Sequence, residues 1–301
     1  MEFRFGDIAV ACTNVDRVMF PDAGITKGEV LAYYADIAEV MVPELAHRPL
    51  TLERFTKGVD QGGFYQKHAQ KHYPPWIGRV ELGAKTRVTY PLCDTPAALV
   101  YFANQGGIVL HVWTSRHDAP DHPDELVFDL DPPEGRFDMV RQVARILREL
   151  LDKLELAAFV KVTGSKGVHV VAPLDATASF SDVLGFCDHA SRLLCTLYPD
   201  LVTSEFYKKD RRGRLYLDTM RNAYAATMVA PYSLRGRPGA PISAPIEWSE
   251  LDDIAPDGIR MREVRARLDR RGDPWAQLRM RPGSIATAQR ALDRLLATAG
   301  T

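Results

Sequence analysis

Hydrophobic residues recur at helical intervals in several parts of the chain. Thr26 and Glu29 have the S/T-x-x-E spacing of a capping box, and apolar residues then follow at intervals of three or four. The same periodicity predicts helices over residues 94–105 and 140–154. Ser181 is placed to cap a further helix, because a serine side chain can accept a hydrogen bond from the first turn.

Short apolar runs rich in β-branched residues predict strands instead. We expect strands at residues 108–113, 125–131, 159–163, 168–172, 214–218 and 227–230. Residues 62–76 are irregular and aromatic, which is typical of a loop. The mixture of hairpins and helices favours an α+β, or mixed α/β, fold over a doubly wound parallel sheet. We expect one domain over residues 1–301, ending in a polar helical tail at about residues 274–301.

Composition narrows the class of protein. Hydrophobic residues make up 46% and charged residues 26% of the chain, as in a folded domain, and the net charge of -1 confines any nucleic-acid surface to a local patch. The four cysteines show no C-x-x-C pairing, so we expect neither zinc nor a disulfide framework. No apolar run approaches the roughly 18 residues of a membrane span. These features predict a cytoplasmic protein with no membrane partner.

Three aspartates at predicted strand ends are candidate metal ligands. Asp129 and Asp131 are two residues apart on one strand, so both carboxylates point to the same face. Adjacent carboxylates repel each other unless a cation joins them, and Mg²⁺ or Mn²⁺ prefers such oxygen ligands. Asp218 ends another strand and is a candidate third ligand, although a turn residue is an equally good interpretation. Three carboxylates would be enough ligands from the protein for a two-metal site.

A glycine-rich turn follows these acids. Glycines at a hairpin tip let backbone N–H groups face an anion, and Ser165, Lys166 and His169 can add donors around Gly167. This predicts a triphosphate site, with a common connecting turn as the alternative. It is not a Walker A loop. Arg235 is either a phosphate clamp or a solvated loop arginine.

Four ordered motifs carry a resemblance to a known family. Residues 128–132, 163–169, 218–222 and 230–235 strongly resemble the polymerase domain of bacterial DNA ligase D, a member of the archaeo-eukaryotic primase superfamily, and the similarity runs from about residue 14 to about residue 273. The resemblance implies a primase-like catalytic core with β-sheets flanked by helices. It also implies metal binding by Asp129, Asp131 and Asp218, and triphosphate contacts from the hairpin tip and Arg235.

The resemblance assigns further roles that spacing alone does not. His111, which by itself is better interpreted as a core histidine, becomes an active-site residue, and Phe64 becomes a platform that stacks on the incoming base. Asn14, Arg17 and Lys27 are expected to bind a 5′-phosphate of DNA. Helix N-termini favour anions, which supports this last expectation.

The family further implies gap filling or end extension during non-homologous end joining. Expected partners are gapped or broken DNA with a 5′-phosphate, ribonucleoside or deoxyribonucleoside triphosphates, a separate DNA ligase and an end-binding repair protein at the nucleoid. Two divalent ions, Mn²⁺ or Mg²⁺, are the expected cofactors, and ribonucleotides the preferred substrates. Glu53 departs from the family, which has a basic residue at the position we align with it. Since ligase and nuclease sequences are lacking, a stand-alone relative or an excised domain is expected.

Three other functions share part of this pattern. A primase that makes primers de novo would have the same motifs. A non-catalytic end-binding module that recruits a ligase would not need all three aspartates. A polymerase-β-type nucleotidyltransferase places Gly-Ser before the acids, whereas Gly164 and Ser165 follow them here.

Overall fold

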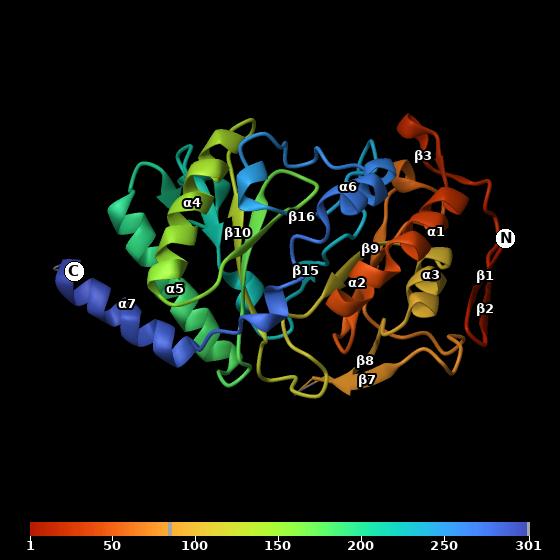
Figure 1. Ribbon diagram of the computed structural model, residues 1–301, viewed down its shortest axis with the longest axis horizontal. Coiled ribbons are helices and arrows are strands. Elements are labelled where there is room, and N and C mark those ends of the chain that lie inside the picture. Colours follow the sequence, from red (N-terminus) through yellow and green to blue (C-terminus); the bar gives the residue numbers. More distant parts are fainter. Residues whose placement is uncertain (84–85, 300–301) are drawn as a thin grey trace. The chain divides into compact units, whose positions relative to one another are not determined.

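A computed structural model describes residues 1–83 and 86–299 (Figure 1). The chain divides into two compact units. Unit 1 consists of Met1–Trp113, Thr227–Ala244 and Asp257–Asp273, and unit 2 of Thr114–Ala226, Pro245–Pro256 and Pro274–Thr301.

Unit 1 is built on a sheet with the strand order β15-β9-β5-β6. Its strands are β15 (Met228–Val229), β9 (Gly107–Val112), β5 (Leu50–Arg54) and β6 (Phe64–Gln66). The helices are α1 (Lys27–Asp36), α2 (Ala38–Leu45), α3 (Pro96–Asn104) and α6 (Val264–Arg271). Hairpins are formed by β1 (Glu2–Phe5) with β2 (Ile8–Ala11), β3 (Val18–Phe20) with β4 (Ile25–Thr26), and β7 (Arg79–Leu82) with β8 (Val88–Pro91).

The predicted capping box is present at the start of α1. The Thr26 hydroxyl accepts a hydrogen bond from the Glu29 amide, and the Glu29 carboxylate accepts one from the Thr26 amide. The helix ends at Ile37, where α2 begins, so the single helix expected here is two. The expectation of a loop over residues 62–76 was wrong in part, because β6 pairs there with β5, and the pairing supplies the regularity that the sequence lacks.

Unit 2 contains a sheet with the strand order β13-β14-β10-β12-β11-β16. These strands are β13 (Val202–Thr203), β14 (Leu215–Asp218), β10 (Glu125–Asp131), β12 (Val168–Pro173), β11 (Phe159–Val162) and β16 (Pro245–Ile246). Neighbouring strands are antiparallel except for β13 and β14. The helices are α4 (Phe137–Lys153), α5 (Phe180–Leu197) and α7 (Ile285–Ala299).

The two faces of the unit 2 sheet differ in character. Phe128 and Leu130 of β10 are fully buried, and α4, whose apolar side chains are buried, packs against β10 and β12. Side chains alternate along a strand, so Asp129 and Asp131 lie on the opposite face. The N-cap of α5 is Ser179 and not Ser181, because Ser179 has extended backbone angles and shares reciprocal hydrogen bonds with Asp182.

The predicted mixed α/β class is confirmed, since both units contain largely antiparallel sheets together with helices. Within the described part of the chain, no helix combines the length and apolar character needed to cross a membrane.

Candidate active site

A row of charged residues crosses the unit 2 sheet. Asp129 of β10 is the direct register partner of Asp218 on β14 and of His169 on β12, and His169 is in turn opposite Lys161 on β11. Directly opposed residues of antiparallel strands have their side chains on the same face. Four strands therefore bring two acids, an imidazole and an ammonium group into one line.

The charges in this row are mutually dependent. Arg221 Nε donates to Asp129 Oδ2 at 3.1 Å, and His169 Nε2 lies 3.6 Å from the same oxygen. Burial acts to raise the pKa of Asp129, but His169 and Arg221 outweigh it and hold this pKa well below its usual value. Asp218 behaves oppositely, because burial and the neighbouring Asp129 charge raise its pKa. Burial and the Lys161 charge lower the pKa of His169 to about 4, so its imidazole is neutral at pH 7.

Asp131 is paired with an arginine that sequence reasoning did not single out. Arg211 Nη1 donates to Asp131 Oδ2 at 2.9 Å, and its guanidinium lies 4.1 Å from the centre of the Tyr216 ring. The charged residues that line a cavity of about 210 Å³ are two acids and four bases, namely Asp131, Glu134, Lys166, Lys208, Arg211 and Arg214. This surrounding suits an anion with several negative charges.

The three aspartates fit a hard divalent cation by the type of their donors. All offer carboxylate oxygens, which Mg²⁺ and Mn²⁺ prefer. Arg221 and Arg211 form ion pairs with Asp129 and Asp131. Among residues 1–83 and 86–299, no three His, Cys, Asp or Glu side chains lie close enough together to hold a metal ion as they stand. A bound ion would therefore replace the Arg221 and Arg211 charges at these carboxylates.

The turn after β11 has the shape that its glycines allow. Gly164 has a φ of 65°, which favours glycine, and a Cβ at Gly167 would lie only 2.0 Å from the Leu130 carbonyl oxygen. The Thr163 hydroxyl donates to the Gly167 carbonyl at 3.0 Å, which closes the turn. Lys166 is exposed and lines the same cavity as Asp131. The structure thus brings one predicted phosphate residue, Lys166, and one predicted metal ligand, Asp131, to the same cavity.

Unit 1 holds a second group of predicted site residues. His111 lies on β9, with Nε2 4.0 Å from Glu53 Oε2 and its ring 5.6 Å from that of Tyr65. The Phe64 side chain on β6 is 49% exposed, and the Arg54 guanidinium lies 5.5 Å from its ring centre. The Phe64 ring is therefore partly exposed, with a cation near it, and is not a core residue.

The segment that carries Arg235 is held against β9 and α1. The Ser233 hydroxyl accepts a hydrogen bond from the Leu110 amide at 2.8 Å, and the Leu234 amide donates to the Tyr34 hydroxyl at 3.1 Å. The Arg235 amide donates to the Pro241 carbonyl at 2.9 Å. These bonds fix the backbone of an arginine that is half-buried.

The residues expected at the 5′-phosphate lie together, but the helix end is not free. Asn14 and Arg17 are exposed, whereas Lys27 is buried and its ammonium donates to the Thr13 carbonyl and to Asn104 Oδ1. Burial lowers the pKa of Lys27, and Arg17 adds to this effect. The Lys27 and Gly28 amides donate to the Arg17 and Val15 carbonyls. The preceding loop therefore occupies these two first-turn N–H groups, so the helix N-terminus does not offer them to an anion.

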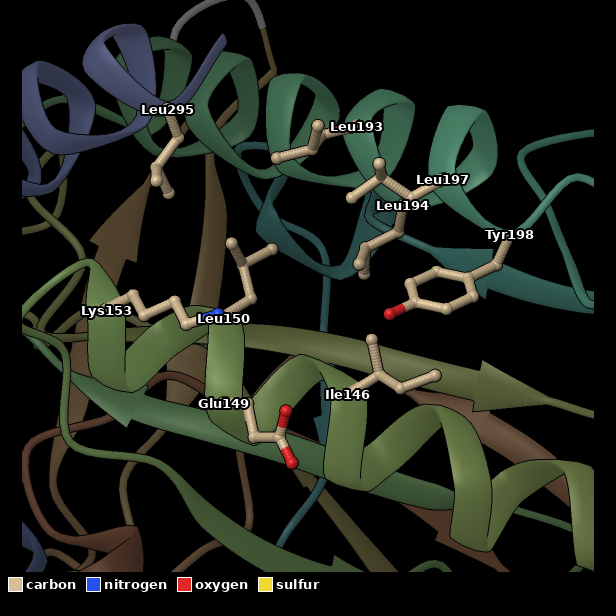
Figure 2. Close-up of a pocket in the computed structure, with 9 residues that line it drawn as sticks. All are labelled: Ile146, Glu149, Leu150, Lys153, Leu193, Leu194, Leu197, Tyr198 and Leu295. Atoms are coloured by element: carbon tan, nitrogen blue, oxygen red, sulfur yellow. The ribbon is translucent and has the colours of Figure 1, made fainter. Parts of the chain in front are cut away.

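Another cavity, of about 280 Å³, is lined mainly by apolar side chains of α4, α5 and α7 (Figure 2). Leucines such as Leu150 and Leu194 line it, and Glu149, Lys153 and Tyr198 are its polar residues. Because α4 covers the sheet face opposite Asp129 and Asp131, this cavity lies apart from the carboxylates.

Two functional candidates were missed in the sequence, although each had a signal. Arg221 is three residues from Asp218 within a motif already noted, and it contacts both Asp129 and Asp218. Arg211 belongs to a basic run over residues 208–214, just before β14. Asn222 supports them, because its side chain donates to the Val127 carbonyl and accepts from the Val127 amide.

Carboxylates on adjacent antiparallel strands beside a cavity with basic residues are features expected of a metal-dependent phosphoryl-transfer site. The family described as "LigD, primase-polymerase domain" matches residues 26–275, and the chain belongs to this family. The predicted resemblance is thereby confirmed.

Individual proteins with similar sequences agree with this assignment. The chain is 38% identical to the multifunctional non-homologous end joining DNA repair protein LigD of Mycobacterium tuberculosis, over 88% of its own length and 36% of the relative. It is 30% identical to LigD of Pseudomonas aeruginosa, over 95% of its length and 35% of the relative. The chain thus spans about a third of the length of these relatives.

A solved structure of the polymerase domain of Mycobacterium tuberculosis ligase D in complex with DNA is similar to the chain, with a TM-score of 0.86 and 36% identity. The match covers 91% of this chain and 99% of that domain. It confirms the predicted fold.

Proposed function

We propose that the chain is a template-directed nucleotidyltransferase that adds nucleotides, with a preference for ribonucleotides, to DNA 3′ ends at gaps or breaks during non-homologous end joining. The observation that carries the proposal is the position of Asp129, Asp218 and Asp131 on adjacent strands beside a cavity lined by Lys166 and Arg211. Nucleotidyl transfer requires acidic residues that bind the metal ions and positive charges that bind the phosphates.

Asp129, Asp131 and Asp218 would hold two divalent ions, Mn²⁺ or Mg²⁺. When bound, such ions activate a 3′-hydroxyl and neutralise charge that develops on the phosphates. The chain's own residues then select and orient the nucleotide. Ser165, Lys166, Gly167, His169 and Arg235 would bind the triphosphate, Phe64 would stack on the base, and His111 would act beside Glu53 in the active site.

His169 has a specific part in this proposal. Its ring is buried, opposite both Asp129 and Lys161, and its pKa of about 4 keeps it neutral. A neutral imidazole retains one N–H donor, which can serve Asp129 or a phosphate oxygen without adding positive charge.

Primer extension on gapped DNA tests the proposed function. The chain should extend a primer across a short gap only when Mn²⁺ or Mg²⁺ is present, faster with ribonucleotides than with deoxyribonucleotides. A dinucleotide formed on a single-stranded template without primer would identify a primase. DNA binding with no extension under any metal or nucleotide would identify a module that only recruits a ligase and end-binding protein.

We further propose that Asn14, Arg17 and Lys27 bind the 5′-phosphate on the far side of a gap. The two positive charges lie close enough for Arg17 to lower the Lys27 pKa, and an anion bound near them would reduce this repulsion. A terminal phosphate carries more charge than a diester, so the chain should bind a gap with a 5′-phosphate more tightly than one with a 5′-hydroxyl. The double substitution Arg17→Ala with Lys27→Ala should remove this preference at fixed salt. The control Arg4→Ala, which removes an exposed arginine, should keep it. A preference that survives the double substitution places the phosphate site elsewhere.

A further inference from the structure

The ring of Phe55 is enclosed by two glycines that are far apart in the sequence. A Cβ at Gly63 would lie 2.7 Å from Phe55 Cε1, and a Cβ at Gly236 would lie 2.3 Å from Phe55 Cζ. Ordinary contact begins at 3.4 Å, so a methyl group at Gly236 is about 1 Å too close. Neither glycine has a φ in the left-handed region. The ring, and not the backbone angle, is therefore what requires glycine at both positions.

The position of Phe55 is itself fixed by its backbone. It follows directly after β5, and its amide donates to the Gly106 carbonyl at 2.8 Å. Its side chain is only 4% exposed. A Cβ at Gly106 would lie 3.0 Å from the Phe55 carbonyl oxygen, so this side of the residue is tightly packed as well. The backbone that carries the ring is therefore held in place at the strand end, and the buried ring is closely surrounded.

The two glycines adjoin the proposed nucleotide residues of unit 1. Gly63 directly precedes Phe64, and Gly236 directly follows Arg235. The residue before Phe55 belongs to the same arrangement, because the Arg54 guanidinium lies over the Phe64 ring and donates to Gln66 Oε1 at 2.6 Å. The end of β5 thus contacts both segments.

We infer that Phe55 is a positioning residue that sets the distance between the Phe64 and Arg235 segments, so that base stacking and triphosphate binding act on one nucleotide. This inference rests on the proposed function, which assigns Phe64 and Arg235 to the nucleotide. Phe55 itself does not contact substrate in this arrangement. Its effect passes through the two glycine backbones that lie against its ring.

The test measures nucleotide KM, kcat, DNA affinity and thermal unfolding for Gly236→Ala and Gly63→Ala. A displacement of a substrate-binding segment by about 1 Å can lower kcat/KM on the order of 100-fold. We expect Gly236→Ala to raise the nucleotide KM at least about tenfold, a conservative share of that loss, and Gly63→Ala to raise it less, because its methyl group is less crowded. Affinity for DNA should stay unchanged. Gly185→Ala, in α5 with nothing within 4 Å of the added Cβ, is the matched control. It should leave KM, kcat and DNA affinity unchanged, and its unfolding temperature should stay the same or rise, because alanine is favoured over glycine inside a helix.

Phe55→Leu supplies the second arm, because a smaller side chain makes room for the methyl group. Adding Phe55→Leu to Gly236→Ala should recover part of the lost nucleotide affinity, whereas Phe55→Leu alone should weaken it. A raised KM without any recovery in the double variant would overturn the inference. So would a lowered unfolding temperature with an unchanged KM, which is the result of simple core filling. If Gly236→Ala does not fold, Gly63→Ala with and without Phe55→Leu decides by the same criteria.

Arg235→Ala separates failure of the inference from failure of the proposed function. An unchanged nucleotide KM in Arg235→Ala would refute the proposed role of Arg235 and the inference with it. A raised KM in Arg235→Ala, with an unchanged KM in both glycine variants, would leave the proposed function standing and refute the role of Phe55 alone.

Discussion

Asp129→Asn changes one atom of the proposed metal site and keeps its shape. The wild-type carboxylate is opposed by Asp218, and accepts a hydrogen bond from Arg221 at 3.1 Å. An amide retains one oxygen acceptor but loses the negative charge. We expect DNA binding to persist, because metal ligands serve the chemical step and not phosphate contacts.

The expected loss of activity is large compared with the loss of stability. A metal ion contributes several kcal/mol of charge stabilisation in the transition state, and each 1.36 kcal/mol is tenfold in rate, so we expect about a 10³-fold lower kcat. The Arg221 side chain is 42% exposed, so its pair with Asp129 contributes about 1 kcal/mol or less to folding. That corresponds to roughly 2 °C in the unfolding temperature.

Asp218→Asn is the matched variant, and it should not lower the stability of the fold as Asp129→Asn should. The pKa of Asp129 is lowered in the folded state, so its ionised form stabilises the protein at neutral pH, and this stability is lost as the pH falls. The pKa of Asp218 is raised, so its ionised form is disfavoured. Without added metal, Asp129→Asn should therefore lower the unfolding temperature, and Asp218→Asn should maintain or raise it, although both should greatly slow extension.

The assay combines single-turnover extension of a gapped duplex, DNA binding by fluorescence anisotropy, and thermal unfolding with and without Mn²⁺. Ligand binding to the folded state raises the unfolding temperature by mass action, and both variants should lose this Mn²⁺-dependent rise. Extension at near-normal rates by Asp129→Asn would refute the metal assignment, whatever happens to stability.

Other substitutions test the nucleotide residues. Lys166→Ala and Arg235→Ala should raise the nucleotide KM with little change in kcat, more so for Arg235 because a guanidinium can bond two oxygens, and unchanged steady-state constants in both would contradict the triphosphate assignment. Phe64→Ala should cost about 1 to 3 kcal/mol of base stacking in nucleotide affinity, and full recovery by Phe64→Leu would show that the ring only fills space. Lys161→Met should raise the pKa of His169 above about 4, measured by NMR titration, because it removes a cation that acts with burial to lower this pKa. An unmoved pKa would mean that burial alone is responsible.

Local patterns predicted most elements because they depend on nearby residues. The capping box at Thr26 and the strand that ends at Asp131 were both predicted from a few consecutive positions. Two of the differences between expectation and structure arose where contacts outside the local segment decide. β6 is a strand because β5 lies beside it, and the preceding loop occupies the amides of Lys27 and Gly28. Neither partner is adjacent in the sequence.

The candidate site shows the same division between local and distant information. The D-x-D spacing placed Asp129 and Asp131 on one face without any knowledge of tertiary structure. The line of Lys161, His169, Asp129 and Asp218 depends on the pairing register of four strands, and a shift by one residue in any strand would turn its member to the other face.

This dependence on register explains why the turn between β11 and β12 is so tightly constrained. Gly167 lies against the Leu130 carbonyl, where any Cβ would be 2.0 Å from the oxygen, and the Thr163 hydroxyl closes the turn on the other side. A larger residue at position 167 would push β12 away from β10 and separate His169 from Asp129. The glycine that makes room for a proposed phosphate contact at the tip therefore also maintains the alignment of the acids. The proposed phosphate and metal sites of this unit would therefore both depend on the close contact between Gly167 and the Leu130 carbonyl.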